Sequence, residues 1–360
     1  MNRYDIAIVG AGIAGAGLAA ELAPHARVLL LEAEDRPGYH ATGRSAAYWS
    51  ETYGGPGVQP LTSASGAFLR DGGFLEPLGS LHIGRADEAP AIEAFLREFE
   101  GTGVPLAPVD PATMVPGLRP DWTLAVLESS CAYIDVAALH GAFLAAARRA
   151  GAVLQVSAEL HAAEWGADGW RIATRAGDFA AGLLVDAAGA WADVVAERAG
   201  VAPIGIQPYR RTMVQLRPDP LAPAGLPHVA HIGGTFYFKR EGGGRLWLSP
   251  HDEIPSDPCD AQPELIDVAT AIDRFEHVVD WGVAAVEHKW AGLRSFAPDR
   301  LPVYGFDSAR PGFFWCAGQG GFGIQTAPAA ARLAAAMILG DARVAVPHGV
   351  DPARYAPSRF

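Results

Sequence analysis

Residues 4–22 read YDIAIVGAGIAGAGLAAEL, and this stretch predicts a strand, a tight glycine turn and a helix in succession. The apolar run Tyr4–Val9 has the composition of a buried strand, and the Ala- and Leu-rich segment after the glycines has that of a helix. A second apolar run, Arg27–Leu31, ends at Glu32. Because two parallel strands need a crossover connection, the start of the chain predicts a βαβ unit.

The glycines of GAGIAG have the GxGxxG spacing of dinucleotide-binding turns. Gly10 permits the tight turn, Gly12 lets backbone amides approach a pyrophosphate, and Gly15 lets the helix pack on the strand. The helix N-terminus adds a partial positive charge, and Glu32, about 20 residues downstream, can accept hydrogen bonds from a ribose. A glycine turn in an ordinary α/β protein is the alternative. The strand before the motif and the helix after it favour the dinucleotide site.

Two remote segments, AAGAW at 187–191 and GQGGFGIQT at 318–326, favour FAD over NAD. The second segment places glycine amides at the start of a helix, where they can stabilise a flavin ring that becomes anionic on reduction. Taken alone it could be a plain helix N-terminus. In an NAD-dependent dehydrogenase, GRSAA (43–47) and GQGGFGIQT would lack a role.

Composition and charge restrict the class of protein. The net charge is −12 and no basic run is present, which argues against nucleic-acid binding. The three cysteines are far apart and lack CxxC spacing, so we expect neither a disulfide framework nor a metal site. We expect the protein to reside in a reducing cytoplasm. The longest apolar helix-like stretch, Thr326–Leu339, is shorter than the ~20 residues of a membrane span and contains Arg332, so we expect no integral membrane segment.

The predicted fold class is α/β with an α+β insert. A Rossmann-like FAD-binding domain is expected over residues 1–83, 135–205 and 290–345, and a substrate-binding domain with a mixed antiparallel sheet over 84–134 and 206–289. Residues 346–360 form a C-terminal tail. Residues 34–57 are polar, glycine-rich and aromatic, and we expect a folded loop with a short helix there.

With these pieces in place, the chain resembles the D-amino-acid oxidase superfamily of flavoproteins over nearly its whole length, and within it bacterial FAD-dependent D-arginine dehydrogenases. The motifs that carry the resemblance are GAGIAG (10–15), PGYHATGRSAA (37–47), GAWAD (189–193), QPYRR (207–211), FYFK (236–239), WAGLRSF (290–296) and GQGGFGIQT (318–326).

The resemblance implies noncovalent FAD and a set of cofactor-binding residues from the two glycine regions, Glu32 and the loop after it, and the motifs AAGAW and WAGLRSF. They are Gly10, Gly12, Ile13, Ala14, Gly15, Glu32, Ala33, Thr42, Gly43, Arg44, Ser45, Ala46, Ala47, Ala188, Gly189, Trp191, Gly292, Gly318, Gly320, Gly321, Phe322, Gly323, Ile324 and Gln325. Cys316 lies in an apolar strand, so we expect a buried core residue rather than a flavin attachment site.

For the substrate, the resemblance points to Tyr53, Tyr237, Arg294, Arg211 and Gln325, and it places Tyr48 at a further active-site position. A guanidinium such as that of Arg294 grips a carboxylate with a planar two-toothed fork, and tyrosine hydroxyls add donors. A structural ion pair is the alternative for each arginine, and Arg210 competes with Arg211 for the position that faces the substrate.

Two departures from the arginine-specific enzymes concern the substrate side chain. Tyr48 replaces a histidine, and Ser80 stands where those enzymes have a glutamate for the guanidinium. A cationic side chain would lose its partner, so we expect a neutral or apolar one.

The expected reaction is the oxidative deamination of D-amino acids. Hydride passes from Cα to flavin N5, and the resulting imino acid hydrolyses to a 2-oxo acid. Tyr53 or ordered water accepts the amine proton, and the electron acceptor is oxygen or a quinone. Oxidation of a secondary amine or a glycine-like substrate is the alternative reaction, and a noncatalytic flavin-binding module is the alternative outside enzymes.

Overall fold

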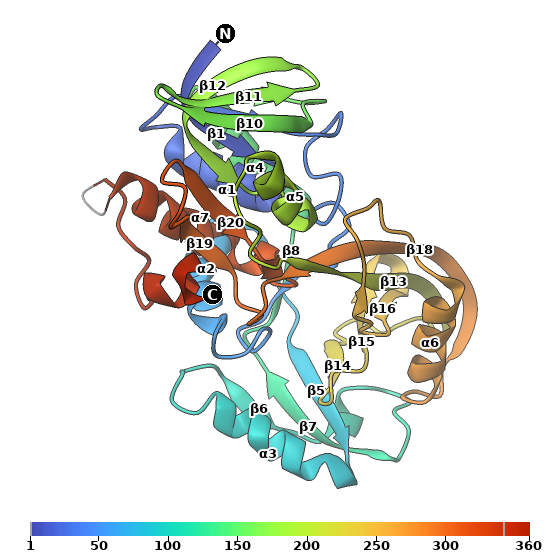
Figure 1. Cartoon of the computed structure of the whole chain (residues 1–360). Coiled ribbons are helices and arrows are strands. Elements are labelled where there is room, and N and C mark those ends of the chain that lie inside the picture. The colour runs from blue at the N-terminus through green and yellow to red at the C-terminus, as the bar shows by residue number, and fades with distance from the viewer. Residues whose placement is uncertain (1, 341–342) are drawn as a thin grey trace.

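The computed structural model describes residues 2–340 and 343–360, in which two large sheets share one molecule (Figure 1). Residue 1 and residues 341–342, which fall in the predicted segments 1–83 and 290–345, lie outside the described residues. The predicted α/β class with a second, mixed sheet is confirmed.

The first sheet carries the predicted βαβ unit. β1 (Asn2–Val9) lies parallel to both β2 (Val28–Leu31) and β12 (Gly177–Asp186), with Ile8 opposite Leu30 on one side and Val185 on the other. The remaining strands are β9 (Val153–Gln155), β10 (Leu160–Gly166), β11 (Gly169–Thr174), β19 (Val303–Phe306) and β20 (Phe313–Ala317).

Small residues let one helix pack closely against two others. α1 (Ile13–Leu22) lies against α4 (Val136–Arg149) and α7 (Gly323–Leu339). A Cβ on Gly17 would lie 3.3 Å from that of Ala331, a separation that leaves little space for any larger side chain. α2 (Gln59–Asp71) also packs on α7, and α5 (Ala192–Arg198) covers β10 and β12.

The second sheet has ten strands and is built around the antiparallel pair β13 (Gln207–Asp219) and β18 (Gly282–Phe296), which lie side by side in Figure 1. Its other strands are β5 (Ser80–Arg85), β6 (Leu106–Pro108), β7 (Trp122–Glu128), β14 (His228–His231), β15 (Tyr237–Glu241), β16 (Arg245–Ser249), β17 (Ile254–Pro255) and β21 (Gln319–Gly320). α3 (Ala89–Glu98) packs against β5 and β7, and α6 (Leu265–Glu276) against β13, β16 and β18.

A small third sheet joins β3 (Tyr48–Trp49), β8 (Ala132–Ile134) and β4 (Leu75–Pro77). The short helix expected within residues 34–57 is absent there: bends and turns cover residues 33–44 and β3 follows. Gly38, with φ of +75°, cannot continue a right-handed helix, and the amide of Gly43 instead bonds back to its carbonyl at 2.8 Å.

The proposed domain boundaries at 83/84 and 289/290 fall inside β5 and β18, both of which belong to the second sheet. We therefore propose that the substrate-binding domain takes in each of these strands whole. In the part of the chain that is described, no helix is both long and apolar enough to span a membrane.

Candidate active site

A cavity of about 400 Å³ extends from the glycine turn after β1 to the paired strands β13 and β18. Its volume lies in the range of ligand sites. Most of the predicted cofactor residues line it, namely Gly10, Gly12, Ile13, Ala14, Glu32, Ala33, Thr42, Arg44, Ser45, Ala46, Ala188, Gly189, Trp191, Gly292, Gly320, Gly321, Gly323 and Ile324. The structure thus brings together segments that are remote in sequence.

The glycine turn has the close approaches that GxGxxG predicts. Gly10 has φ of +101°, and a Cβ there would lie 2.4 Å from the Ala187 carbonyl oxygen. A Cβ on Gly15 would lie 1.9 Å from the Gly10 oxygen. Gly15 therefore lets α1 pack against the turn, and it does not line the cavity.

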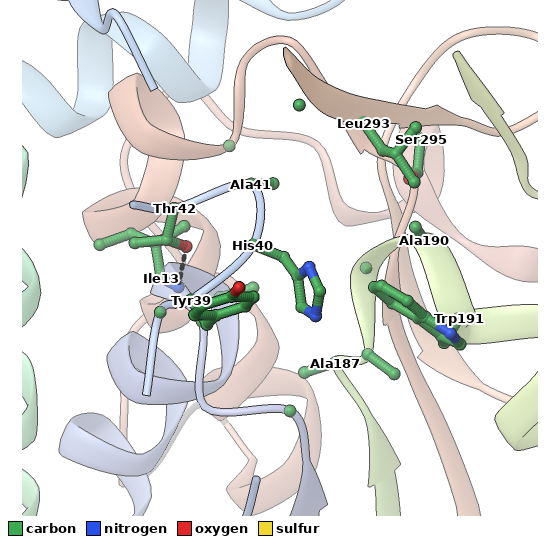
Figure 2. Close-up of a pocket in the computed structure, with 18 of the residues that line it drawn as sticks. Ile13, Tyr39, His40, Ala41, Thr42, Ala187, Ala190, Trp191, Leu293 and Ser295 are labelled. Atoms are coloured by element: carbon green, nitrogen blue, oxygen red, sulfur yellow. Dashed lines mark hydrogen bonds between the residues drawn. The ribbon is translucent and has the colours of Figure 1, made fainter. Parts of the chain in front are cut away.

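The start of α1 is held by a residue from the loop after β2. Gly12, the residue before the helix, supplies no side-chain cap, and the Thr42 hydroxyl instead accepts a hydrogen bond from the Ile13 amide at 3.0 Å (Figure 2). A Cβ on Gly12 would lie 3.2 Å from this hydroxyl. The arrangement keeps the helix N-terminus open toward the cavity, as a pyrophosphate would require.

Glu32 lines the cavity and also braces the turn. Its carboxylate accepts hydrogen bonds from the amides of Ala11 and Glu34, each at 3.0 Å. Burial raises the pKa of Glu32, although both amides oppose the rise. Hydrogen bonding of Glu32 to a ribose stays a prediction.

The predicted cofactor residues that do not line the cavity are Gly15, Gly43, Ala47, Gly318, Phe322 and Gln325. Gly43 serves a turn, because a Cβ there would lie 2.6 Å from the Gly38 oxygen. Conversely, the prediction missed Tyr39, His40 and Ala41 as lining residues. The His40 and Trp191 rings lie 4.6 Å apart and form one wall (Figure 2). The motif PGYHATGRSAA, which carries part of the family resemblance, contains His40, so the sequence does point to this residue.

The other end of the cavity is set by the register of β13 and β18. Arg211 lies opposite Gly292, and Tyr209 lies opposite Arg294. Because side chains alternate along a strand, Arg211, Gly292 and Arg294 share one face of the sheet. Gly292 has no side chain, so this position leaves space open beside the guanidinium groups of Arg211 and Arg294. Arg44 lies across from it, since a Cβ on Gly292 would lie 3.5 Å from the Arg44 Cβ.

Arg294 is a half-buried cation that has no acidic partner among the described residues. Its Nη1 donates to the Tyr53 hydroxyl at 2.6 Å, and among the described residues no carboxylate lies within salt-bridge distance of it. Burial disfavours the charged form, but the hydroxyl groups of Tyr53, Tyr237 and Tyr48 outweigh burial and hold the pKa of Arg294 above its usual value. A half-buried charge of this kind, facing a cavity, calls for an anionic ligand.

Arg211 faces the cavity and Arg210 does not. Arg210 pairs with Glu264 and, at 2.9 Å, with Asp267 on the other face of the strand. Arg211 is 3% exposed, and it donates from Nε to the Asp252 carbonyl at 2.6 Å and from Nη2 to Glu253 at 3.3 Å. Its Nη1 is buried and has no hydrogen-bond partner in the described chain. Burial and the charge of Arg294 lower the pKa of Arg211, so both cations favour a shared anion.

Gln325 lies behind the cavity and holds the segment that carries Tyr53. Its Oε1 accepts from the Ser50 amide at 3.3 Å, and its Nε2 donates to the Tyr53 carbonyl at 3.0 Å and the Thr62 hydroxyl at 2.9 Å. The structure thus gives Gln325 contacts suited to positioning Tyr53 rather than to touching a substrate.

Glu128, which sequence reasoning missed, holds the same segment from the other side. It is fully buried and accepts hydrogen bonds from the Ser50 hydroxyl at 2.7 Å, the Thr52 hydroxyl at 2.6 Å and the Glu51 amide at 2.6 Å. Burial opposes its charge, but His82 and these hydroxyl groups outweigh burial and lower the pKa of Glu128. No local pattern around Glu128 marks this role.

Tyr48 and Ser80 do not line the cavity and lie behind Tyr237, which does. The Tyr48 ring lies 4.3 Å from that of His228 and 5.4 Å from that of Tyr53, and the Ser80 hydroxyl is 2.9 Å from His228 Nδ1. The His228 and Tyr237 rings are 5.4 Å apart. Tyr48, His228 and Tyr237 thus form one aromatic cluster, and of these three only Tyr237 lines the cavity.

The cysteines divide between the core and the cavity. Cys316 is buried, and burial raises the pKa of its thiol to about 12, so it lacks the exposed thiolate that covalent attachment requires. Cys259 lines the cavity and was missed by the prediction. Over the described residues, no three His, Cys, Asp or Glu side chains gather in a cluster that could hold a metal ion.

Comparison with known proteins identifies relatives over the whole length. The family model described as FAD dependent oxidoreductase (DAO) matches residues 5–337. A glycine oxidase of Geobacillus kaustophilus is 27% identical over 359 residues, 94% of this chain and 93% of the relative. The crystal structure of a glycine oxidase from the same organism matches with a TM-score of 0.85 at 25% identity, over 100% of both chains.

Two further proteins extend the comparison. A glycine oxidase of Pseudomonas aeruginosa is 28% identical over 383 residues, with 98% of each chain covered. The crystal structure of an L-proline dehydrogenase from P. horikoshii has a TM-score of 0.86 at 22% identity, covering 100% of this chain and 98% of that one, which shows a shared fold. The resemblance to arginine-specific dehydrogenases thus holds at the level of the family, since the relatives from Geobacillus kaustophilus and Pseudomonas aeruginosa are both glycine oxidases.

Proposed function

The chain belongs to the DAO family of FAD-dependent oxidoreductases, and we propose that it oxidises the C–N bond of a small amino acid of the glycine or sarcosine type. The observation that carries the substrate class is Arg294, a half-buried cation at the end of the cofactor cavity with no acidic partner in the described residues. The D-amino acids expected from the sequence become the second candidate, because the relatives support the glycine-like alternative better.

The cavity fits FAD at the end that the glycine turn forms. Gly10 and Gly12 leave room for a pyrophosphate at the open N-terminus of α1, and Thr42 holds the first helical amide. When bound, FAD supplies the two-electron acceptor for the substrate's Cα–H bond. The chain's own residues orient the substrate for that chemistry.

Substrate binding rests on Arg294, Arg211 and Tyr53. In this proposal the substrate carboxylate bonds to the free edge of Arg294 and to Arg211 Nη1, which then gains the partner it lacks in the described chain. Tyr53 accepts its hydrogen bond from Arg294, so the phenolic proton is free to bond to the same carboxylate. This arrangement favours ordered water over Tyr53 as acceptor of the amine proton.

The preference for a small substrate rests on the aromatic cluster. Tyr48, His228 and Tyr237 pack against one another at centroid distances of 4.3–6.3 Å and fill the space next to the carboxylate site. A hydrogen or methyl group at Cα fits better beside such a wall than a longer side chain.

The test is the visible spectrum of purified protein during anaerobic addition of single amines. Glycine, sarcosine, D-alanine, L-alanine, L-proline and D-arginine form the panel. Bleaching of the flavin band by glycine or sarcosine supports the proposal, and air admitted afterwards separates an oxidase from a dehydrogenase. Bleaching by D-alanine alone would favour the second candidate, and bleaching by L-proline or D-arginine alone would overturn both.

A further inference from the structure

A second cavity, of about 320 Å³, lies next to the substrate end of the first. Its lining comes from the loop after Thr42, from β13, β16 and β18, and from the loop before α6: Gly43, Arg44, Ser45, Gln215, Trp247, Ala261, Gln262, His288, Trp290 and Ala291. Nothing in the amine oxidation proposed above uses this second cavity.

The wall between the two cavities is thin and well held. Arg44, Ser45 and Ala261 line both. Arg44 Nη1 donates to the carbonyls of Ala261 at 2.9 Å and Ala291 at 3.2 Å, and its other nitrogen pairs with Asp260. The Trp290 indole, which lines the second cavity, donates to the Arg44 carbonyl at 2.9 Å and so is attached to the wall that both cavities share.

The second cavity has aromatic walls. The His288 and Trp290 rings are stacked at 5.3 Å with an interplanar angle of 22°, and Trp247 meets Trp290 edge-on at 5.1 Å. Among the described lining residues, Arg44 alone is permanently charged, and it is already paired with Asp260. An amino acid zwitterion would find no free ionic partner in that lining, whereas an uncharged planar ring would find stacking surfaces.

Polar groups at the rim suit ring carbonyls. Gln262 is exposed, and its amide can donate, as can the imidazole of the exposed His288. The Gln215 amide is engaged with Trp247 at 2.9 Å and Glu287 at 3.2 Å, so it braces the wall. A flat ring with two carbonyl oxygens matches these surfaces and donors.

We propose that this second cavity binds a quinone-type electron acceptor. The bound quinone takes two electrons from the reduced cofactor in the adjoining cavity and, with two protons, becomes a quinol, so that the cofactor is oxidised again. The inference rests on FAD occupying the first cavity and is independent of which amine is oxidised.

The experiment uses the holoenzyme, water-soluble ubiquinone-0 and one cavity-filling variant. Gln262→Trp places an indole in the second cavity. Lys289→Trp adds the same group at an exposed neighbour on β18, whose side chain alternates with those of His288 and Trp290 and so points to the other face. Quinone binding to the oxidised holoenzyme is measured by calorimetry. Reoxidation is followed anaerobically by stopped flow after photochemical reduction, so no amine substrate is needed.

We expect saturable quinone binding to the unmodified enzyme and to Lys289→Trp. In Gln262→Trp, binding should weaken by about tenfold or more, which corresponds to about 1.4 kcal/mol. The reoxidation rate should fall in parallel. Absence of saturable binding to the unmodified enzyme would overturn the proposal. Equal binding and reoxidation in Gln262→Trp would also overturn it, because the quinone would then act elsewhere. A failed amine panel with intact quinone reoxidation would count against the proposed function alone.

Discussion

Arg294 donates a hydrogen bond to the Tyr53 hydroxyl at 2.6 Å, although 241 residues separate the two in the chain. The contact ties β18 of the second sheet to the loop after β3, so the proposed carboxylate site forms only when both parts of the molecule are folded together. Substitutions at this site and in its surroundings therefore have specific expected effects.

Replacing Arg294 with leucine should raise the Michaelis constant for the amino acid by about 100-fold, because loss of one partner of a buried charged pair costs about 2–5 kcal/mol. Tyr53→Phe should raise it less, by about tenfold, since a hydrogen bond to a charged group contributes about 1.5–3 kcal/mol. Steady-state kinetics and the flavin spectrum measure both effects. Unchanged substrate affinity in Arg294→Leu, with flavin bound, would exclude Arg294 as the carboxylate site.

Gln325→Leu should make the position of Tyr53 less fixed, although residue 325 does not contact the substrate in this proposal. It leaves the Ser50 amide and the Tyr53 carbonyl without their partner, and each unsatisfied buried group costs about 1–3 kcal/mol. We expect a lower melting temperature and a higher Michaelis constant with flavin still bound. Gln325→Glu keeps the acceptor for the Ser50 amide but loses the donor to the Tyr53 carbonyl, so it separates the two contacts. A normal Michaelis constant in Gln325→Leu would remove Gln325 from any positioning role.

Tyr48→Ala should widen the substrate range. Removing this ring opens the space beside His228 and Tyr237, so D-norvaline and D-leucine should gain relative to glycine by about tenfold in kcat/KM, which is within the ~1–3 kcal/mol that a methylene contributes in an apolar pocket. Tyr48→Phe keeps the ring and serves as the matched variant. If Tyr48→Ala and Tyr48→Phe show the same substrate preference, the aromatic cluster does not limit side-chain size.

Gly12→Ala should weaken FAD binding while the fold persists. The added methyl would lie 3.2 Å from the Thr42 hydroxyl and crowd the first amide of α1, and we expect an increase of about tenfold in the dissociation constant, about 1.4 kcal/mol. Gly141→Ala, on α4, meets no atom within 4 Å and is the control. Fluorescence titration of the apoprotein with FAD measures both, and equal affinities would refute the pyrophosphate site at Gly12.

His251 should make the fold acid-sensitive. Burial and the charges of Arg211 and Arg294 lower its pKa from 6.5 to about 3. Between these values the unfolded chain binds a proton that the folded chain does not, so the free energy of unfolding falls as the pH drops from about 6.5 toward 3.

The variant His251→Asn tests this dependence. Asparagine tolerates the left-handed backbone of His251, whose φ is +54°, and cannot titrate. Melting temperatures should therefore depend less on pH over this range in His251→Asn, whereas the exposed control His161→Asn should follow the unmodified protein. Parallel profiles for all three proteins would show that His251 does not contribute.

The adjacent pair Arg210 and Arg211 shows where reasoning from sequence stops. Neighbouring strand residues point to opposite faces, so QPYRR could place either guanidinium in the cavity. The choice follows from Asp267 and Glu264 on one face and from Asp252 and Glu253 on the other, residues 41–57 positions away. Gln325 and Tyr48 are similar cases, because both lie one layer behind the cavity in contacts that no local pattern records.

The βαβ unit, its GxGxxG turn and the FAD cofactor could be read from the amino-acid sequence, because strand alternation, glycine conformation and helix composition depend on residues a few positions apart. The sequence could not show that Arg211 faces the cavity or that Glu128 and Gln325 hold the segment of Tyr53. It also could not show the aromatic cluster around Tyr48 or the second cavity at Trp290. Each of these depends on strand register and on packing between segments tens to hundreds of residues apart, and those long-range contacts form only when the two sheets assemble.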